Sequence, residues 1–187
     1  MIRRFLTTAL FASLTILLPA LAHAQSAVEP NTVTVTPFLS ASFGTSNDLS
    51  SSLGIGAAVG YDWTKNLGFE FEVARVFDVA GDSENLDWSL TNIHANVIYH
   101  FDVPRVTPYA VFGLGWEHSN IDLDDDALDD DIDLDSSTEV AWNIGGGVKY
   151  ELNDRLLLRG DLRRFQANDI APDHWRLYGG LTFWIKR

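Results

Sequence analysis

The chain has 187 residues, a formal net charge of −13 and no cysteine. That length suits a single domain, and an acidic chain without a clustered basic stripe is poorly suited to binding nucleic acid. The absence of cysteine excludes a disulfide scaffold, thiol catalysis and Cys-based zinc sites. Beyond the N-terminus, no apolar run reaches the ~18 residues of a membrane-spanning helix, which excludes a helical membrane protein.

Residues 1–24 have the features of a secretory signal peptide. Arg3 and Arg4 form a basic start, an apolar stretch follows, and Ala22-His23-Ala24 supplies a small–x–small cleavage site. We therefore expect cleavage after residue 24, export of the chain, and a mature domain over residues 25–187.

The mature chain alternates apolar and other residues in eight segments, which is the pattern of β-strands. Each segment is close to the ~9–11 residues that a tilted strand needs to cross a bilayer. The expected strands cover residues 32–43, 52–63, 67–74, 92–101, 109–117, 140–150, 156–163 and 175–185.

The links between these strands alternate in length. Those after the second, fourth and sixth strands are short, whereas those after the third and fifth are long, at residues 78–87 and 117–139. An up-and-down barrel with one short-turn end and one long-loop end has this asymmetry.

The apolar face of the strands is too bulky for the inside of a small barrel. It carries Trp63, Trp116, Trp142 and Trp175 besides many Phe, Tyr and Leu residues. In the alternative, a lipocalin-like barrel, the apolar face would point inward. Side chains just fill an eight-stranded interior, so this many large groups would overpack it. The opposite face is rich in glycine, which suits a cramped lumen. The sequence therefore predicts an all-β fold, an eight-stranded antiparallel up-and-down transmembrane β-barrel whose apolar face meets lipid.

Four stretches resemble the small outer-membrane β-barrels of Gram-negative bacteria, the outer membrane protein beta-barrel domain or opacity-like porin family. They are Pro108–Gly115, Ala141–Val148, Leu158–Arg163 and the C-terminal pattern Tyr178-x-Gly180-x-x-Phe183-x-Ile185. The size class is that of OmpX and the OmpA membrane domain. The resemblance covers the chain from about residue 32 onward and is specific for fold rather than function.

The resemblance implies several properties. The protein is expected in the cell outer membrane, as a monomer in contact with lipid and lipopolysaccharide. The pattern of Tyr178, Gly180, Phe183 and Ile185 resembles the signal that the barrel assembly machinery reads, although Lys186 and Arg187 follow it where family members often end on an aromatic residue. Both termini are expected in the periplasm, with four extracellular loops and no further domain after the eighth strand.

Seven charged residues have the parity of inward positions. Buried charges need partners, and both signs are present, so we expect a structural ion-pair network that fills the lumen. The alternative is a narrow polar pore whose selectivity these residues set. The residues are Glu70, Glu72, Lys149, Arg159, Asp161, Arg163 and Arg176.

The histidines suggest two further chemistries, neither favoured. His94 and His100 share the inward face but are six residues apart on one strand, too far to chelate one metal ion, and are expected to be interior polar residues. The sequence His118-Ser119-Asn120 is close to the His-x-Ser-Asn stretch of lipid A deacylases. Adjacent strand residues point to opposite faces, however, so His118 could not activate Ser119, and we expect no enzyme.

The longest loop is strongly acidic and holds the candidate metal ligands of the sequence. Asp122, Asp124 and Asp126 have the spacing that starts an EF-hand loop, but Ala127 replaces the turn glycine and Asp133 the bidentate glutamate. Weak binding of Ca²⁺ or Mg²⁺ is one interpretation and a merely solvated loop is the other; no other cofactor is expected. Apolar residues on both sides of the loop predict that the fifth and sixth strands continue as a protruding hairpin, from Ile121, Leu123, Ile132 and Leu134.

The net charge is unevenly distributed along the chain. With Glu117 assigned to the fifth strand, the expected links after the first, third, fifth and seventh strands contain 17 of the 26 acidic residues and no Lys or Arg. This polarity favours a structural or surface-interaction role through acidic extracellular loops. A narrow porin-like channel for small solutes is the alternative, and a lipid A-modifying enzyme is a distant third.

Overall fold

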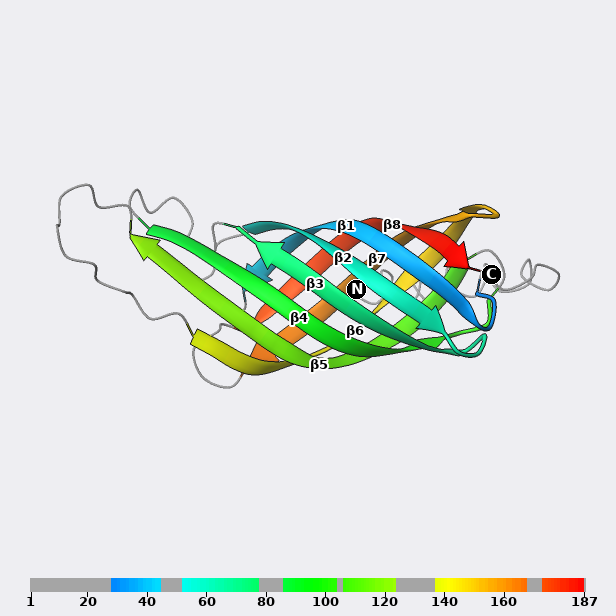
Figure 1. Ribbon diagram of the computed structural model, residues 1–187, viewed down its shortest axis with the longest axis horizontal. Helices are drawn as coiled ribbons and strands as arrows, with labels where there is room; N and C mark the ends of the chain where they lie inside the picture. Colours follow the sequence, from blue (N-terminus) through cyan, green and yellow to red (C-terminus); the bar gives the residue numbers. More distant parts are fainter. Residues whose placement is uncertain are drawn as a thin grey trace, which may run out of the picture.

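The computed structural model describes residues 28–44, 52–77, 86–103, 106–123, 137–167 and 173–186. Within these residues the chain forms eight β-strands, each hydrogen-bonded antiparallel to the next, and β1 pairs with β8 to close the barrel (Figure 1). The strands are β1 (Thr32–Gly44), β2 (Ser52–Asp62), β3 (Leu67–Val76), β4 (Leu86–His100), β5 (Val106–Leu123), β6 (Ser137–Asn153), β7 (Leu156–Ala167) and β8 (His174–Lys186). The predicted eight-stranded antiparallel barrel is confirmed.

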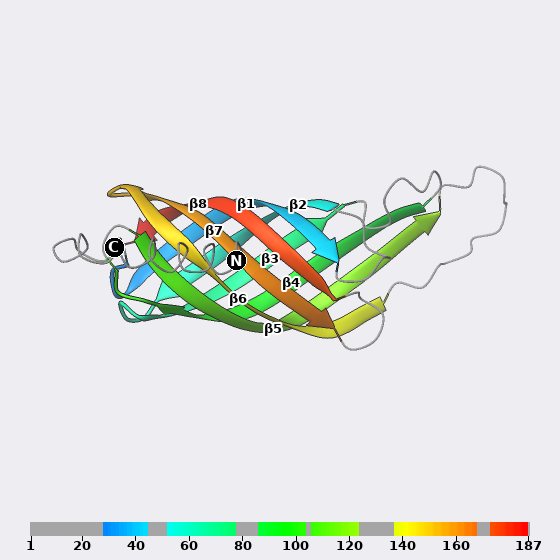
Figure 2. The same cartoon turned by 180° about the vertical axis from the view of Figure 1, so that it is seen from behind.

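The two ends of the barrel differ. The start of β1, the end of β8 and the short links β2–β3 and β6–β7 lie at one end, which we name the short-turn end (Figure 2). We name the opposite end, where β3 ends and β4 begins, the long-loop end. No part of the described chain forms a helix that is long and apolar enough to cross a membrane.

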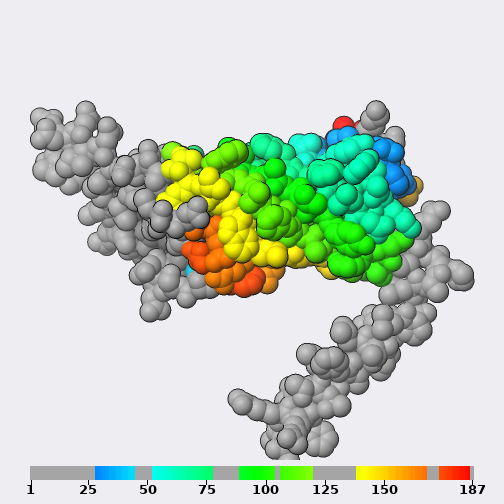
Figure 3. All heavy atoms as spheres, turned by 90° about the horizontal axis from the view of Figure 1, so that it is seen from below, coloured from blue at the N-terminus to red at the C-terminus, as the bar shows by residue number. Residues whose placement is uncertain are grey.

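Side chains alternate between a buried lumen and an exposed outer wall, as the period of a β-strand requires. Ile55, Phe71 and Trp116 are exposed on the wall, whereas Gly54, Glu72 and Gly115 are buried. Figure 3 shows one face of this wall, where the side chains of β3 to β7 lie side by side. Most bulky apolar groups lie outside, as predicted, and the lumen holds glycines, polar and charged residues together with the aromatic residues Phe38, Tyr109, Phe165 and Tyr178.

At the long-loop end, β4 and β5 extend beyond the membrane-crossing strands expected over residues 92–101 and 109–117. β5 pairs with β6 as far as Ser119 opposite Ser137, and beyond this point it continues along β4 until Leu123 lies opposite Leu86. The continuation of β5 to Leu123 agrees with one arm of the predicted hairpin. Residues 124–136, which include Ile132 and Leu134 of the other arm, lie outside the described residues, so the hairpin itself stays a prediction.

Candidate functional site: the charged lumen

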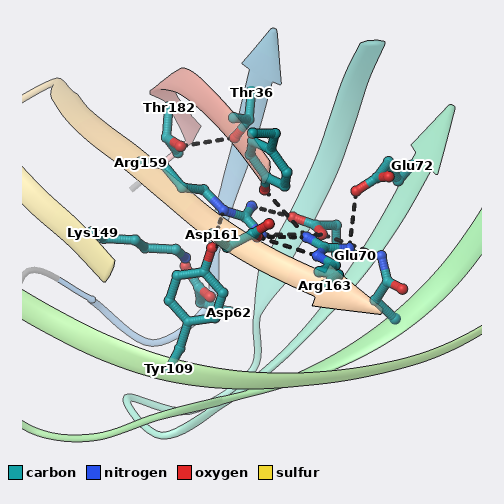
Figure 4. Close-up of polar contacts among 12 residues, drawn as sticks. Thr36, Asp62, Glu70, Glu72, Tyr109, Lys149, Arg159, Asp161, Arg163 and Thr182 are labelled. Atoms are coloured by element: carbon teal, nitrogen blue, oxygen red, sulfur yellow. Dashed lines mark hydrogen bonds and ion pairs between the residues drawn. The ribbon is translucent and has the colours of Figure 1, made fainter. Parts of the chain in front are cut away.

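Strands β3 and β7 supply most of the charge in the lumen. They stand four places apart in the ring of eight strands, so they face each other across the barrel. Glu70 and Glu72 point inward from β3, and Arg159, Asp161 and Arg163 point inward from β7, because residues two apart on a strand share a face. Carboxylates and guanidinium groups thus approach one another from opposite walls (Figure 4).

Ion pairs join these side chains across the lumen. Arg163 is central: its Nη2 lies 3.2 Å from Glu70 Oε1 and 2.9 Å from Asp161 Oδ2, and its Nη1 lies 3.0 Å from Glu72 Oε2. Arg159 pairs with Glu70 and lies 3.3 Å from Asp161 Oδ2. Arg176 from β8 pairs with Glu72. We name these six residues the lumen network.

Neutral side chains complete the coordination. The Tyr109 hydroxyl donates to Asp161 Oδ2 at 2.6 Å and accepts from Arg159 Nε at 2.7 Å. Asn96 donates to Glu70 Oε1 at 3.2 Å, and Arg163 Nη2 donates to the Tyr178 hydroxyl at 3.2 Å. Tyr178 belongs to the predicted C-terminal assembly pattern, yet its ring lies inside the barrel.

The lumen network is electrically balanced, with three arginines and three carboxylates, all of them buried. Removing such charges from water costs several kcal/mol per ion, which close opposite charges and hydrogen bonds offset only when every member is paired. The structure therefore brings together six of the seven residues predicted to form the lumen ion network, and each of the six is paired with at least one opposite charge.

Lys149, the seventh residue, lies nearer the short-turn end and outside these ion pairs. Its Nζ lies 2.9 Å from Nε2 of His100. Nδ1 of His100 in turn lies 3.9 Å from Asp62 Oδ1, and Thr32 donates to Asp62 at 3.3 Å. Sequence reasoning missed Asp62, although its inward parity at the end of β2 could have revealed it.

The long-loop half of the lumen combines polar and aromatic groups. The guanidinium of Arg176 stacks 4.2 Å from the centre of the Phe165 ring, and the His94 ring meets Phe165 edge-on at 5.1 Å. Asn92 donates a hydrogen bond to the buried carboxylate of Glu117. Phe165 and Glu117 were not predicted as site residues, because Phe165 lies beyond the expected seventh strand and Glu117 was assigned to a loop boundary.

Glycine makes room for these groups at two inward positions. A Cβ on Gly147 would come within 2.6 Å of the Tyr109 hydroxyl oxygen and closer still to Asp161. A Cβ on Gly113 would collide with the amide groups of Asn96 and Asn143, which are joined by a 3.0 Å hydrogen bond. Larger residues here would displace the side chains that fill the lumen.

None of the three predicted metal ligands has a side chain among those that the structure describes. Asp124 and Asp126 lie outside the described residues, as does the side chain of Asp122. Within the described residues, no group of three or more His, Asp or Glu side chains could hold a metal ion. In the C-terminal pattern, Phe183 and Ile185 face outward, while Tyr178 and Gly180 face the lumen.

The histidine-serine pair of β5 is divided between the two faces. Ser119 is buried, whereas His118 faces outward, and its Nδ1 lies 2.8 Å from Thr138 Oγ1. The two side chains therefore cannot act together as nucleophile and base.

Comparison with known proteins places this barrel in a family. Residues 9–183 match the family model described as the outer membrane protein beta-barrel domain, which covers most of the chain. The chain belongs to the outer membrane protein beta-barrel family. It is therefore a protein of the bacterial outer membrane, its outward face contacts lipid, and the predicted localisation is confirmed.

Individual relatives agree with this assignment. Outer membrane protein Omp38 of Acinetobacter baumannii is 29% identical over 142 residues, which cover 72% of this chain and 39% of Omp38. The chain thus spans well under half the length of that relative. The N-terminal β-barrel domain of Pseudomonas aeruginosa OprF superposes with a TM-score of 0.63 at 20% identity, covering 84% of this chain and all of that domain. Neisserial surface protein A gives 0.62 at 19% identity, covering 81% and 95%. These structures share the fold.

Proposed function

We propose that this protein is a non-conducting outer-membrane barrel that serves as a structural scaffold and acts at the cell surface through its long-loop end. The cleaved signal peptide of residues 1–24 and assembly through the C-terminal pattern belong to the same proposal. The long-loop end then faces the medium, and the two ends of the described chain face the periplasm.

The observation that carries the proposal is the set of ion pairs between opposite walls. Arg163 on β7 contacts both Glu70 and Glu72 on β3, so side chains span the lumen at this level. An ion passing along the axis would have to break buried ion pairs, which costs several kcal/mol. An eight-stranded barrel leaves an interior just wide enough for side chains, which supports the same conclusion.

The distribution of charge supports a role at the long-loop end. Most acidic residues of the sequence lie in the links at this end, without Lys or Arg among them. A dense negative field of this kind attracts cations and basic partners through long-range electrostatics. Weak Ca²⁺ or Mg²⁺ binding around Asp122, Asp124 and Asp126 is part of this proposal.

Conductance in a planar lipid bilayer tests the proposal. The refolded protein, with folding checked by its heat-modifiable mobility in gels, is expected to give no discrete single-channel steps in concentrated KCl. Reproducible steps from the folded wild type would overturn the proposal and favour the narrow channel.

Two double variants test whether the lumen network prevents ion conduction through the barrel. E70A/R163A removes one acid and one base from the lumen and keeps the charge balance, so folded protein should gain measurable conductance. K65A/D102A removes the exposed ion pair at the short-turn end and should stay silent. Equal conductance of E70A/R163A and K65A/D102A would mean that the lumen network does not close the barrel to ions.

A further inference from the structure

Arg75 is a charged residue on the outer wall, near the long-loop end of β3. It is exposed, and its neighbours on the same face include Val73 and Ile55. Its Nη2 donates to Ser89 Oγ at 3.3 Å, and its guanidinium lies 5.7 Å from the centre of the Phe77 ring. Within the described part of the chain, none of the ion pairs includes Arg75. Its charge is thus held in place by neutral groups.

Arg164, which faces outward near the same end of β7, shows the contrast. Its Nη2 lies 3.0 Å from Asp173 Oδ2, and its guanidinium lies 5.9 Å from the Trp175 ring. The protein itself supplies the counter-charge of Arg164. Among the described residues, Arg75 has no such anion beside its fork of donors, so an anion from the surroundings would complete it.

Arg75 also begins a polar row across four strands. Register pairs Arg75 with Thr91 on β4, Thr91 with His118 on β5, and His118 with Thr138 on β6. The outward row two residues closer to the short-turn end is entirely apolar. It consists of Val73, Ile93, Trp116 and Val140, which are 41%, 37%, 57% and 55% exposed. The polar row therefore borders the apolar belt of the barrel, with donors above and hydrocarbon-facing side chains below.

We propose that this border is a binding site for a phosphorylated glycolipid of the outer leaflet, with Arg75 as the phosphate ligand. The guanidinium would hold the headgroup phosphate through two parallel hydrogen bonds, and the hydroxyl and imidazole groups of Thr91 and His118 would face the rest of the headgroup. Its acyl chains would lie on Ile93 and Trp116. The outer-leaflet assignment rests on the proposed orientation, with the long-loop end outside.

The test measures retention of diphosphorylated lipid A by the folded full-length barrel in mixed micelles, using native mass spectrometry. R75Q should weaken the apparent affinity about tenfold or more, because a hydrogen-bonded ion pair is lost. Lipid A stripped of phosphate but with the same acyl chains should bind wild type and R75Q equally. Equal retention of the phosphorylated lipid by both proteins would overturn the proposal.

R164Q is the matched control, since Arg164 is also outward-facing but already paired with Asp173. It should retain lipid A as wild type does; a loss as large as that of R75Q would show a general charge effect and overturn the site. Retention of phosphatidylglycerol in preference to lipid A would also overturn the outer-leaflet ligand. None of these outcomes depends on conductance, so failure of this site and failure of the non-conducting barrel are separable.

Discussion

Arg163 and Arg75 carry the same charge in opposite environments of one barrel. Arg163 is fully buried in the lumen and contacts three carboxylates, two of which come from the facing wall. Arg75 stands on the outer wall beside Ser89 and Phe77, where its partners are neutral. Arg163 is thus neutralised by carboxylates inside the lumen, whereas Arg75 has no carboxylate partner among the described residues.

This difference follows from the geometry of a small barrel. Facing walls of the lumen are close enough for arginine and glutamate side chains to meet, so charge there can be paired within the protein. An outward side chain faces only lipid and headgroups, and a charge is tolerated there chiefly near the interface. We expect charged residues in the lumen to determine stability and Arg75 to determine lipid preference.

Replacing each arginine by leucine tests the comparison with the largest expected effect. R163L leaves Glu70, Glu72 and Asp161 buried with too few cations, and should lower the free energy of unfolding by about 3–5 kcal/mol. R75L loses only a charge near the interface and should change it by about 0–1 kcal/mol. Urea unfolding in phospholipid vesicles that lack lipid A measures both.

Two results would contradict this contrast. A small effect of R163L would mean that water or rearranged side chains compensate the three carboxylates. A large effect of R75L without lipid A present would mean that Arg75 stabilises the barrel through protein contacts alone.

The buried ion pair between Glu72 and Arg176 tests whether charges in the lumen stabilise one another. Each single change, E72Q or R176Q, leaves a buried charge without its full complement, but the double variant removes one charge of each sign. The double variant should therefore cost less than the sum of the two, with a coupling of about 0.5–3 kcal/mol in a double-mutant cycle. Additive effects would show that the two side chains are independent.

Strict alternation made the barrel and its two faces predictable from sequence. Gly113 and Gly147 fall on one parity and Trp116 and Val148 on the other, which is enough to assign lumen and wall. The start of β4 at Leu86 was not predicted, because the alternation of the fourth strand was followed only from residue 92, whereas Ile121 and Leu123 did predict that the fifth strand extends beyond the membrane.

The partners inside the lumen could not be predicted in the same way. Parity places Glu70 and Arg163 inside, but their contact depends on how far opposite strands are staggered when the barrel closes. That stagger is also what separates Lys149 from the lumen network and brings it to His100. Tyr178 was assigned to a C-terminal recognition pattern, and only the closed barrel shows its hydroxyl beside Arg163.

Two glycines test whether the lumen is tightly packed while the outer wall has free space. G147A would push into Asp161 and the Tyr109 hydroxyl, and should destabilise the barrel by about 1–3 kcal/mol. G179A faces outward on β8, where a Cβ would meet nothing within 4 Å, and should stay within about 0.5 kcal/mol of wild type. Chemical denaturation measures both, and a tolerated G147A would mean that the lumen side chains can move aside.

Breaking the exposed ion pair between Lys65 and Asp102 should have the smallest effect on the free energy of unfolding. It sets the lower limit against which the buried ion pairs are compared. Its Nζ–Oδ2 distance of 2.9 Å is as short as that between Arg163 and Asp161, yet its side chains are 58% and 43% exposed. Water and salt screen such a pair, so D102N should cost about 0.2–1 kcal/mol and less at high ionic strength. R163L should keep its effect in the same salt, because its partners are buried. If both variants lost their effect equally in salt, the lumen would be as hydrated as the surface, and the ion pairs across it could not be what closes the barrel.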